Sequence, residues 1–241
     1  MKKELTVPKN GALEVKGNED LKHGGMTEEE FILPRLKLLK DDKNGLPAGS
    51  LINKVTGQLF ESLFVPVFAF NTYIKFNGMT IEWISTDRTD PKVDDGLKWK
   101  EGTRGEKIKP TVTQVMNFVG FPSDNLSMPV VVGFKRTSLK SGKAFYTTCY
   151  SNSRGTVPVE GTHFNQFKVK HRYNIFGRKV EDKNYGSYHT LDFSLPKDPE
   201  QFNIQESEQP VYDSLAKTAA FLVNALSADA YEVEADEPLN V

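Results

Sequence analysis

Apolar and polar residues alternate along several short stretches of this chain, a pattern that predicts strands with one buried face. The clearest stretch, residues 64–76, is rich in aromatic and β-branched residues. Asn77 and Gly78 follow it, and because this pair favours tight hairpin turns, residues 80–86 are predicted to return as an antiparallel partner. Further strands are predicted at residues 50–55, 58–63, 111–118, 129–134, 164–176 and 185–195, with turns at 56–57 and 177–184.

Helical periodicity is clearest near the C-terminus, at residues 211–226. Pro210 precedes this stretch and would lie at the N-terminus of the helix, where proline is tolerated. A shorter helix is predicted at residues 137–151, which contain few helix-breaking residues. The apolar stripe of the C-terminal helix is formed by Val211, Leu215, Ala219, Leu222 and Leu226.

These elements predict a mainly β protein, a β-rich α+β fold with an amphipathic C-terminal helix. Residues 86–110 form a long polar excursion within it, and excursions of that length are usually functional or flexible. The predicted organisation is a flexible leader at 1–28, a β domain at 29–195, a linker at 196–210, a helix at 211–228 and an acidic tail at 229–241.

Charge is distributed unevenly, although the formal net charge is only −1. Residues 129–190 hold 11 Lys/Arg against 3 Asp/Glu, whereas residues 191–241 hold 2 against 11. Such asymmetry is typical of a surface for nucleic acid or for an acidic partner. The acids of the tail are Asp229, Glu232, Glu234, Asp236 and Glu237.

Cations and aromatic rings are interleaved in the basic region. Single-stranded nucleic acid requires both, because cations neutralise phosphates and exposed rings stack on unpaired bases. A solvated basic face without a ligand is the alternative. The candidate cations are Lys135, Arg136, Lys140, Lys143, Arg154, Lys168, Lys170 and Arg172, and the candidate rings are Tyr146, Tyr150, Tyr185 and Tyr188.

Strand parity divides the second part of this region. Lys168, Lys170 and Arg172 would share one face of a strand. Phe167, Val169 and Tyr173 would share the opposite face, where packing in the core is favoured over stacking on bases.

Catalytic and metal-binding motifs are not evident. Cys149 is the single cysteine, and the four histidines lack metal-ligand spacing. No stretch is apolar enough to span a membrane, and no apolar signal region follows the first lysines. We therefore expect a cytoplasmic, non-enzymatic protein without a cofactor or a metal.

Two segments resemble a pattern in phage early-region proteins: Leu33 to Leu38, reading LPRLKL, and Gly49 to Gln58, reading GSLINKVTGQ. With the basic, aromatic middle and the acidic tail, the arrangement of residues 30–241 resembles the single-stranded DNA-binding proteins of bacterial viruses. The resemblance implies an OB-fold-like barrel of five strands, elaborated by hairpins, over the β domain. The tail departs from the family pattern, because it ends in Val241 rather than in an aromatic residue.

The expected function is sequence-tolerant binding of single-stranded DNA during replication or recombination in the bacterial host. The tail would bind replication or recombination proteins, and the C-terminal helix would pack on the barrel or mediate self-association. One alternative is a viral structural or assembly protein whose basic region contacts an acidic protein. An enzyme acting on nucleic acid is the third candidate.

Overall fold

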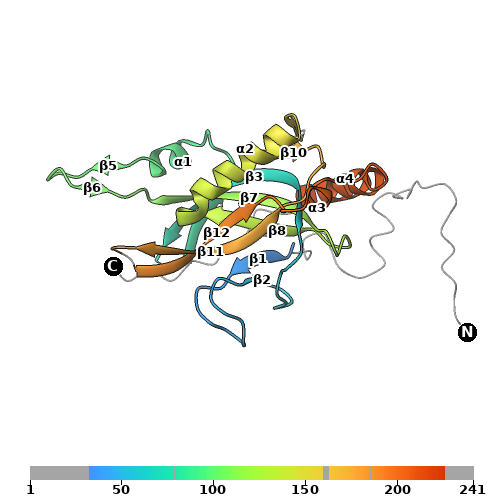
Figure 1. Ribbon diagram of the computed structural model, residues 1–241. Helices are drawn as coiled ribbons and strands as arrows, with labels where there is room; N and C mark the ends of the chain where they lie inside the picture. Colours follow the sequence, from blue (N-terminus) through green and yellow to red (C-terminus); the bar gives the residue numbers. More distant parts are fainter. Residues whose placement is uncertain (1–32, 79, 160–162, 185, 226–241) are drawn as a thin grey trace, which may run out of the picture. The chain divides into compact units, whose positions relative to one another are not determined.

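The computed structural model describes residues 33–78, 80–159, 163–184 and 186–225. A mixed sheet of eight strands forms its centre (Figure 1). The strands are β1 (Arg35–Leu38), β2 (Leu51–Asn53), β3 (Phe64–Asn77), β4 (Thr80–Ser85), β7 (Val112–Pro122), β8 (Val130–Lys135), β9 (Thr156–Pro158) and β10 (Asn165–Phe167). Their order is β2-β1-β8-β7-β3-β10-β9, and β4 pairs with the second half of β3. The mainly β class predicted from the sequence is confirmed.

The sheet is open, so the predicted OB-like barrel is wrong. β2 and β9 lie at its two ends, and no pairing between them closes the sheet within the described residues. β1 runs parallel to β8, while β3, β7 and β8 are antiparallel neighbours. The last strands of the domain do not extend this sheet. β11 (Asn174–Asp182) and β12 (Gly186–Ser194) instead pair with each other as a separate two-stranded sheet.

Turns form close to residues 56–57 and 77–78, where local sequence signals predict them. The β3–β4 hairpin turns at Asn77 and Gly78, and Gly78 has a φ of 61°, which glycine adopts without strain. After β2, the Asn53 side chain accepts hydrogen bonds from the backbone N–H groups of Val55 and Thr56. The partner predicted at residues 58–63 forms only one isolated bridge to β2.

The turn predicted at residues 177–184 is shorter than expected, because β11 continues through Gly177 to Asp182 and the chain turns at Lys183 and Asn184 before β12. A Cβ atom on Gly177 would lie 2.2 Å from the carbonyl oxygen of Gly49. Gly177 is therefore needed for a close approach between two chain segments and does not mark a turn. The strand predicted at residues 164–176 is also interrupted, since β10 ends at Phe167 and β11 begins at Asn174.

The helix predicted at residues 137–151 forms, begins with a 3₁₀ turn and packs across the sheet. The turn η3 covers Arg136–Ser138 and the helix α2 covers Leu139–Asn152. Phe145 and Cys149 on its inner face are 0% and 1% exposed. Gly142 allows α2 to approach the sheet closely, because a Cβ there would lie 2.5 Å from the Cβ of Phe134. Phe145 therefore sits at the centre of the aromatic core.

The C-terminal part contains two helices, α3 (Pro199–Phe202) and α4 (Gln209–Ala225). α4 confirms the predicted helix, but over its first two turns the buried face differs from the predicted stripe; the side chains of Ala219, Leu222 and Leu226 lie outside the described part of the chain. Tyr212 and Ala216 are 2% and 3% exposed, whereas Val211 is 50% exposed. The segment expected as a linker, residues 196–210, contains α3 and hydrogen-bonds to residues 170 and 172.

The polar excursion at residues 86–110 is structured. It contains the helix α1 (Pro91–Gly96) and a two-stranded hairpin of β5 (Lys100–Glu101) and β6 (Lys107–Ile108). The leader, Tyr185 and the tail acids Asp229, Glu232, Glu234, Asp236 and Glu237 lie outside the described residues. Among the described residues, no helix is long and apolar enough to cross a membrane.

Candidate nucleic-acid interface

The outer face of α2 is basic. Lys140 and Lys143 are exposed, and with Thr147 and Tyr150 they follow the spacing of three to four residues that places side chains on one helix face. Phe145 and Cys149 occupy the opposite face, against the sheet. The helix thus separates an apolar side from a cationic side. We call Lys140, Lys143, Thr147 and Tyr150 the α2 basic face.

No carboxylate neutralises this face from nearby in the sequence. Residues 125–159 contain 5 Lys/Arg and no Asp or Glu. The first turn of α2 has no acid and the last turn has no base, so Lys140 lies at the end of the helix dipole that disfavours cations. Each such placement costs about 0.3–1 kcal/mol at an exposed site. Helix stability therefore does not explain this charge pattern.

Two tyrosines add a ring surface beside the cations. The rings of Tyr146 and Tyr150 are stacked with their centroids 6.3 Å apart. Tyr146 is anchored from below, because its ring packs 5.6 Å from that of Phe167. Tyr150 is 49% exposed. The Tyr146 ring thus supports the Tyr150 ring, which is open to solvent.

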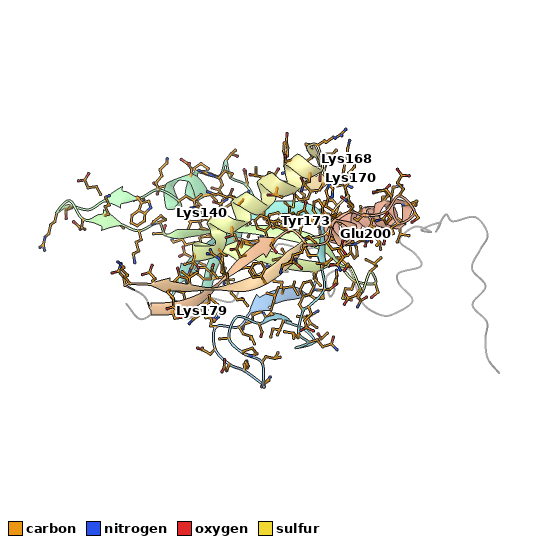
Figure 2. All side chains as sticks on the ribbon, viewed as in Figure 1. Lys140, Lys168, Lys170, Tyr173, Lys179 and Glu200 are labelled. Atoms are coloured by element: carbon orange, nitrogen blue, oxygen red, sulfur yellow. The ribbon has the colours of Figure 1, made fainter. Side chains whose placement is uncertain are left out.

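Lys168 and Lys170 lie near the C-terminal end of α2, whereas Lys140 lies near its start (Figure 2). The Ser153 hydroxyl donates to the Lys168 carbonyl over 3.0 Å, and the Ile204 N–H donates to the Lys170 carbonyl over 3.0 Å. Val169 between them is 3% exposed. The backbone is thereby held while both lysine side chains stay exposed. Buried and exposed side chains alternate from Phe167 to Lys170 as predicted, although residues 168–170 belong to no strand.

Arg172 does not join these lysines. Its guanidinium donates to both carboxylate oxygens of Glu208 over 2.7 Å and to the Asn203 carbonyl over 2.8 Å. The Arg172 side chain is 11% exposed. Hydrogen bonding to this guanidinium lowers the pKa of Glu208. Arg172 therefore connects the segment before β11 to the start of α4 and is unsuited to contact a phosphate.

Lys135 is also displaced from the α2 basic face, whereas Tyr188 lies on a strand that contacts the start of α2. Phe134 points toward α2, where its ring lies 5.9 Å from that of Phe145. Because successive strand residues point to opposite faces, Lys135 points to the other side of the sheet. Tyr188 lies on β12 and is half-buried, two residues before Thr190, whose hydroxyl lies 3.5 Å from that of Thr137 in η3, directly before α2.

Arg136 and Arg154 flank α2, and both have a left-handed backbone. Their φ angles are 48° and 55°. At the C-terminal end, the Gly155 N–H closes the helix on the Tyr150 carbonyl, and Arg154 occupies the position that glycine or asparagine usually takes. An arginine there costs about 1–2 kcal/mol relative to glycine. Both side chains are exposed.

Cys149 and His171 both take part in packing contacts. Burial raises the pKa of the Cys149 thiol, so the thiol stays protonated at neutral pH and is a poor nucleophile. His171 packs against Phe202 with 4.4 Å between ring centroids, and burial lowers its pKa. No group of three or more potential metal ligands occurs among the described residues.

The hairpin of β5 and β6 carries an exposed ring that the sequence-based candidates did not include. Trp99 is 62% exposed and lies between Lys98 and Lys100. Its position between two lysines was visible in the sequence. Its exposure was not, because tryptophan in an unassigned segment is as often part of a core.

A family model described as Pam3 phage gp34-like protein matches residues 7–221. No curated protein matches the chain, and no solved structure matches it either. The match covers most of the 241 residues and supports a phage origin, while the description itself names no activity. The chain therefore belongs to the family of Pam3 phage gp34-like proteins.

Proposed function

We propose that this phage protein binds single-stranded DNA, without strong sequence preference, along the α2 basic face. Lys140 and Lys143 neutralise phosphates, and Tyr150 stacks on an unpaired base. Arg136, Arg154, Lys168 and Lys170 extend the cationic surface beyond both ends of the helix. The binding serves replication or recombination in the cytoplasm of the bacterial host. It is a binding function without catalysis.

The observation that carries this proposal is the composition of the outer face of α2. Cations and one exposed ring share this face, no acid occurs between residues 125 and 159, and the rest of the helix is anchored in the core. Phosphates require the cations, and unpaired bases require the ring. A merely solvated helix face would mix both signs of charge, since mixed charges stabilise helices through pairs one turn apart.

Backbone strain supports the same interpretation. Arg136 and Arg154 hold left-handed conformations that glycine would adopt more easily. Strained residues cluster at functional sites, where the side chain has a role that a relaxed residue would not provide. A guanidinium at each end of α2 suits a strand of phosphates that follows the helix.

The acidic tail has a separate part in the proposal. Residues 229–241 carry five acids and no Lys or Arg, so they are unsuited to phosphates and suited to basic protein surfaces. We assign the tail to recruitment of replication or recombination proteins. The alternative for the whole molecule is an assembly protein whose α2 basic face binds an acidic protein.

The test is a charge reversal on α2 with a matched reversal elsewhere. Lys140→Glu combined with Lys143→Glu is compared with Lys179→Glu combined with Lys183→Glu on the β11–β12 hairpin. Both variants change the net charge equally, and the control also breaks the exposed ion pair between Lys179 and Glu181. Binding is measured by fluorescence anisotropy with labelled oligo(dT) and with a duplex of equal length, across salt concentrations.

Each lost phosphate contact should weaken binding roughly fivefold at 0.1 M salt. It should also reduce the salt slope, the slope of the logarithm of the binding constant against the logarithm of the salt concentration, by about 0.7. The α2 variant should therefore lose roughly 25-fold in affinity and about 1.4 in slope, while the hairpin variant stays close to wild type. Equal losses in both variants would remove α2 as the binding surface. Absence of binding to oligo(dT) at low salt would overturn the proposed function and favour the assembly protein.

A further inference from the structure

The segment that carries Trp99 has a rigid base. Val93 of α1 is 0% exposed and packs with Tyr73 and Val112 of the sheet. The Asp90 side chain caps α1 by accepting from the Lys92 N–H over 2.9 Å. At the other side, the Thr111 N–H donates to the Gly96 carbonyl over 2.9 Å. The hairpin is thus attached to the core at both of its ends.

Beyond this base, β5 and β6 extend away from the central sheet (Figure 1). Lys100 pairs with Ile108, and Glu101 pairs with Lys107. The turn closes through a hydrogen bond from the Gly105 N–H to the Gly102 carbonyl over 3.0 Å. A short antiparallel ribbon of this kind can reach a ligand that also contacts the body of the protein.

The Trp99 side chain differs from Trp83 in being open to solvent. It is 62% exposed, whereas Trp83 packs against the cluster of Tyr73, Val93 and Val112. Large exposed apolar side chains are informative when they are placed among charges, because they commonly mark interaction sites. Burying the Trp99 ring against a partner would therefore be favourable.

The charges around Trp99 indicate which partner fits. Residues 98–109 contain 5 Lys/Arg and 2 Asp/Glu. Lys98 and Lys100 form ion pairs with Asp94 and Asp95 of α1.

The remaining cations of the hairpin have no carboxylate partner among the described residues: Arg104, Lys107 and Lys109. Trp99 directly precedes β5, so strand alternation places it on the face of Glu101, whose cross-strand partner is Lys107. One side of the hairpin thus combines an open indole ring with an unpaired lysine.

We infer that the β5–β6 hairpin is a second contact for single-stranded nucleic acid, with Trp99 stacking on an unpaired base and Lys107 and Lys109 on the phosphates. The inference rests on the proposed function for the class of its ligand. The hairpin is a separate element from α2, so the two contacts are testable independently. Stacking suits any base, because every base has a π face.

Tryptophan fluorescence tests this contact directly, because the chain contains only 2 tryptophans. Oligo(dT) should quench the emission of the full-length protein, and Trp99→Phe should abolish that quench while leaving the emission of Trp83. In parallel, anisotropy of labelled oligo(dT) reports affinity without using tryptophan. Trp99→Ala is expected to weaken binding roughly 5- to 100-fold.

Ile108→Ala is the matched control, because Ile108 is 43% exposed and lies on the opposite face of the same hairpin. It removes apolar surface but no ring, so affinity should stay within about twofold. If wild type binds oligo(dT) and neither the emission nor the affinity depends on Trp99, the hairpin contact is overturned and the α2 proposal stands. Equal quenching by a duplex would also overturn it. Absence of any binding at low salt would overturn both.

Discussion

Replacing Phe145 by alanine tests whether the aromatic cluster beneath α2 holds the basic face in place. The Phe145 ring is 0% exposed, and the rings of Phe118, Phe193 and Tyr173 have their centroids 4.6, 4.9 and 5.1 Å away. These neighbours come from β7, from β12 and from the segment before β11. Phe145 thus connects the helix to three separate parts of the fold.

The expected loss of unfolding free energy follows from these packing contacts. Replacing a buried phenylalanine by alanine costs about 3–5 kcal/mol, and the cost depends on how far the site can collapse. Collapse is restricted here, since Phe118 belongs to a strand paired on both sides. Lost ring contacts add about 0.5–1.5 kcal/mol per pair. We expect a loss of about 4 kcal/mol or more, a large part of the ~5–15 kcal/mol that stabilises a typical protein.

Urea unfolding followed by circular dichroism measures this loss. Phe145→Leu, which keeps most of the apolar volume, should cost about 1 kcal/mol. Tyr150→Ala, on the outer side of the same helix, loses only the stacked contact with Tyr146 and should cost about 0.5–1.5 kcal/mol. A loss below about 1.5 kcal/mol for Phe145→Ala, with an unchanged denaturant slope, would show that Phe145 is not the anchor of α2.

Two predictions concern polar contacts. Hydrogen bonding to Arg172 lowers the pKa of Glu208 from its ordinary value of 4.5. The ionised carboxylate therefore stabilises the folded protein above about pH 4.5, and this stabilisation is lost as the pH falls through the lower pKa of the folded state. Glu208→Gln should therefore cost about 1 kcal/mol in unfolding free energy at pH 7 and progressively less below pH 4.5, and a pH-independent difference would contradict this. Thr72→Val should cost about 1–3 kcal/mol, because the buried Asn117 amide donates to the Thr72 hydroxyl over 2.8 Å. Thr72→Ser keeps this hydrogen bond and removes one buried methyl group, so it should cost less, about 1 kcal/mol; equal losses would refute the role of this hydrogen bond.

The features predicted correctly from the sequence depend on local signals. The Asn77-Gly78 turn joins two alternating stretches that are adjacent in the chain, and the β3–β4 hairpin forms there. Helix α2 follows from an unbroken stretch, and α4 follows from its periodicity. In each case the information lies within about 20 residues, where backbone preferences and periodicity act directly.

The features that were missed depend on contacts between distant residues. Arg172 alternates with Lys168 and Lys170 in the sequence, but its partner Glu208 lies 36 residues further along. Gly177 resembles a turn residue, yet it is required by the approach of Gly49. The parallel pairing of β1 with β8 joins residues almost 100 positions apart, which no local pattern encodes. The open sheet follows from such pairings, so a resemblance in overall arrangement did not predict it.

The two proposed contacts differ in what they can distinguish. Lys140 and Lys143 respond to phosphates, which single and double strands both present, so these cations contribute affinity and little preference. Tyr150 and Trp99 respond to base faces, which are accessible only where bases are unpaired. If the proposed function holds, a preference for single strands would therefore reside in two rings from separate elements. Each element is anchored by a buried side chain, Phe145 for α2 and Val93 for the β5–β6 hairpin, so the core fixes where a strand of nucleic acid can be contacted.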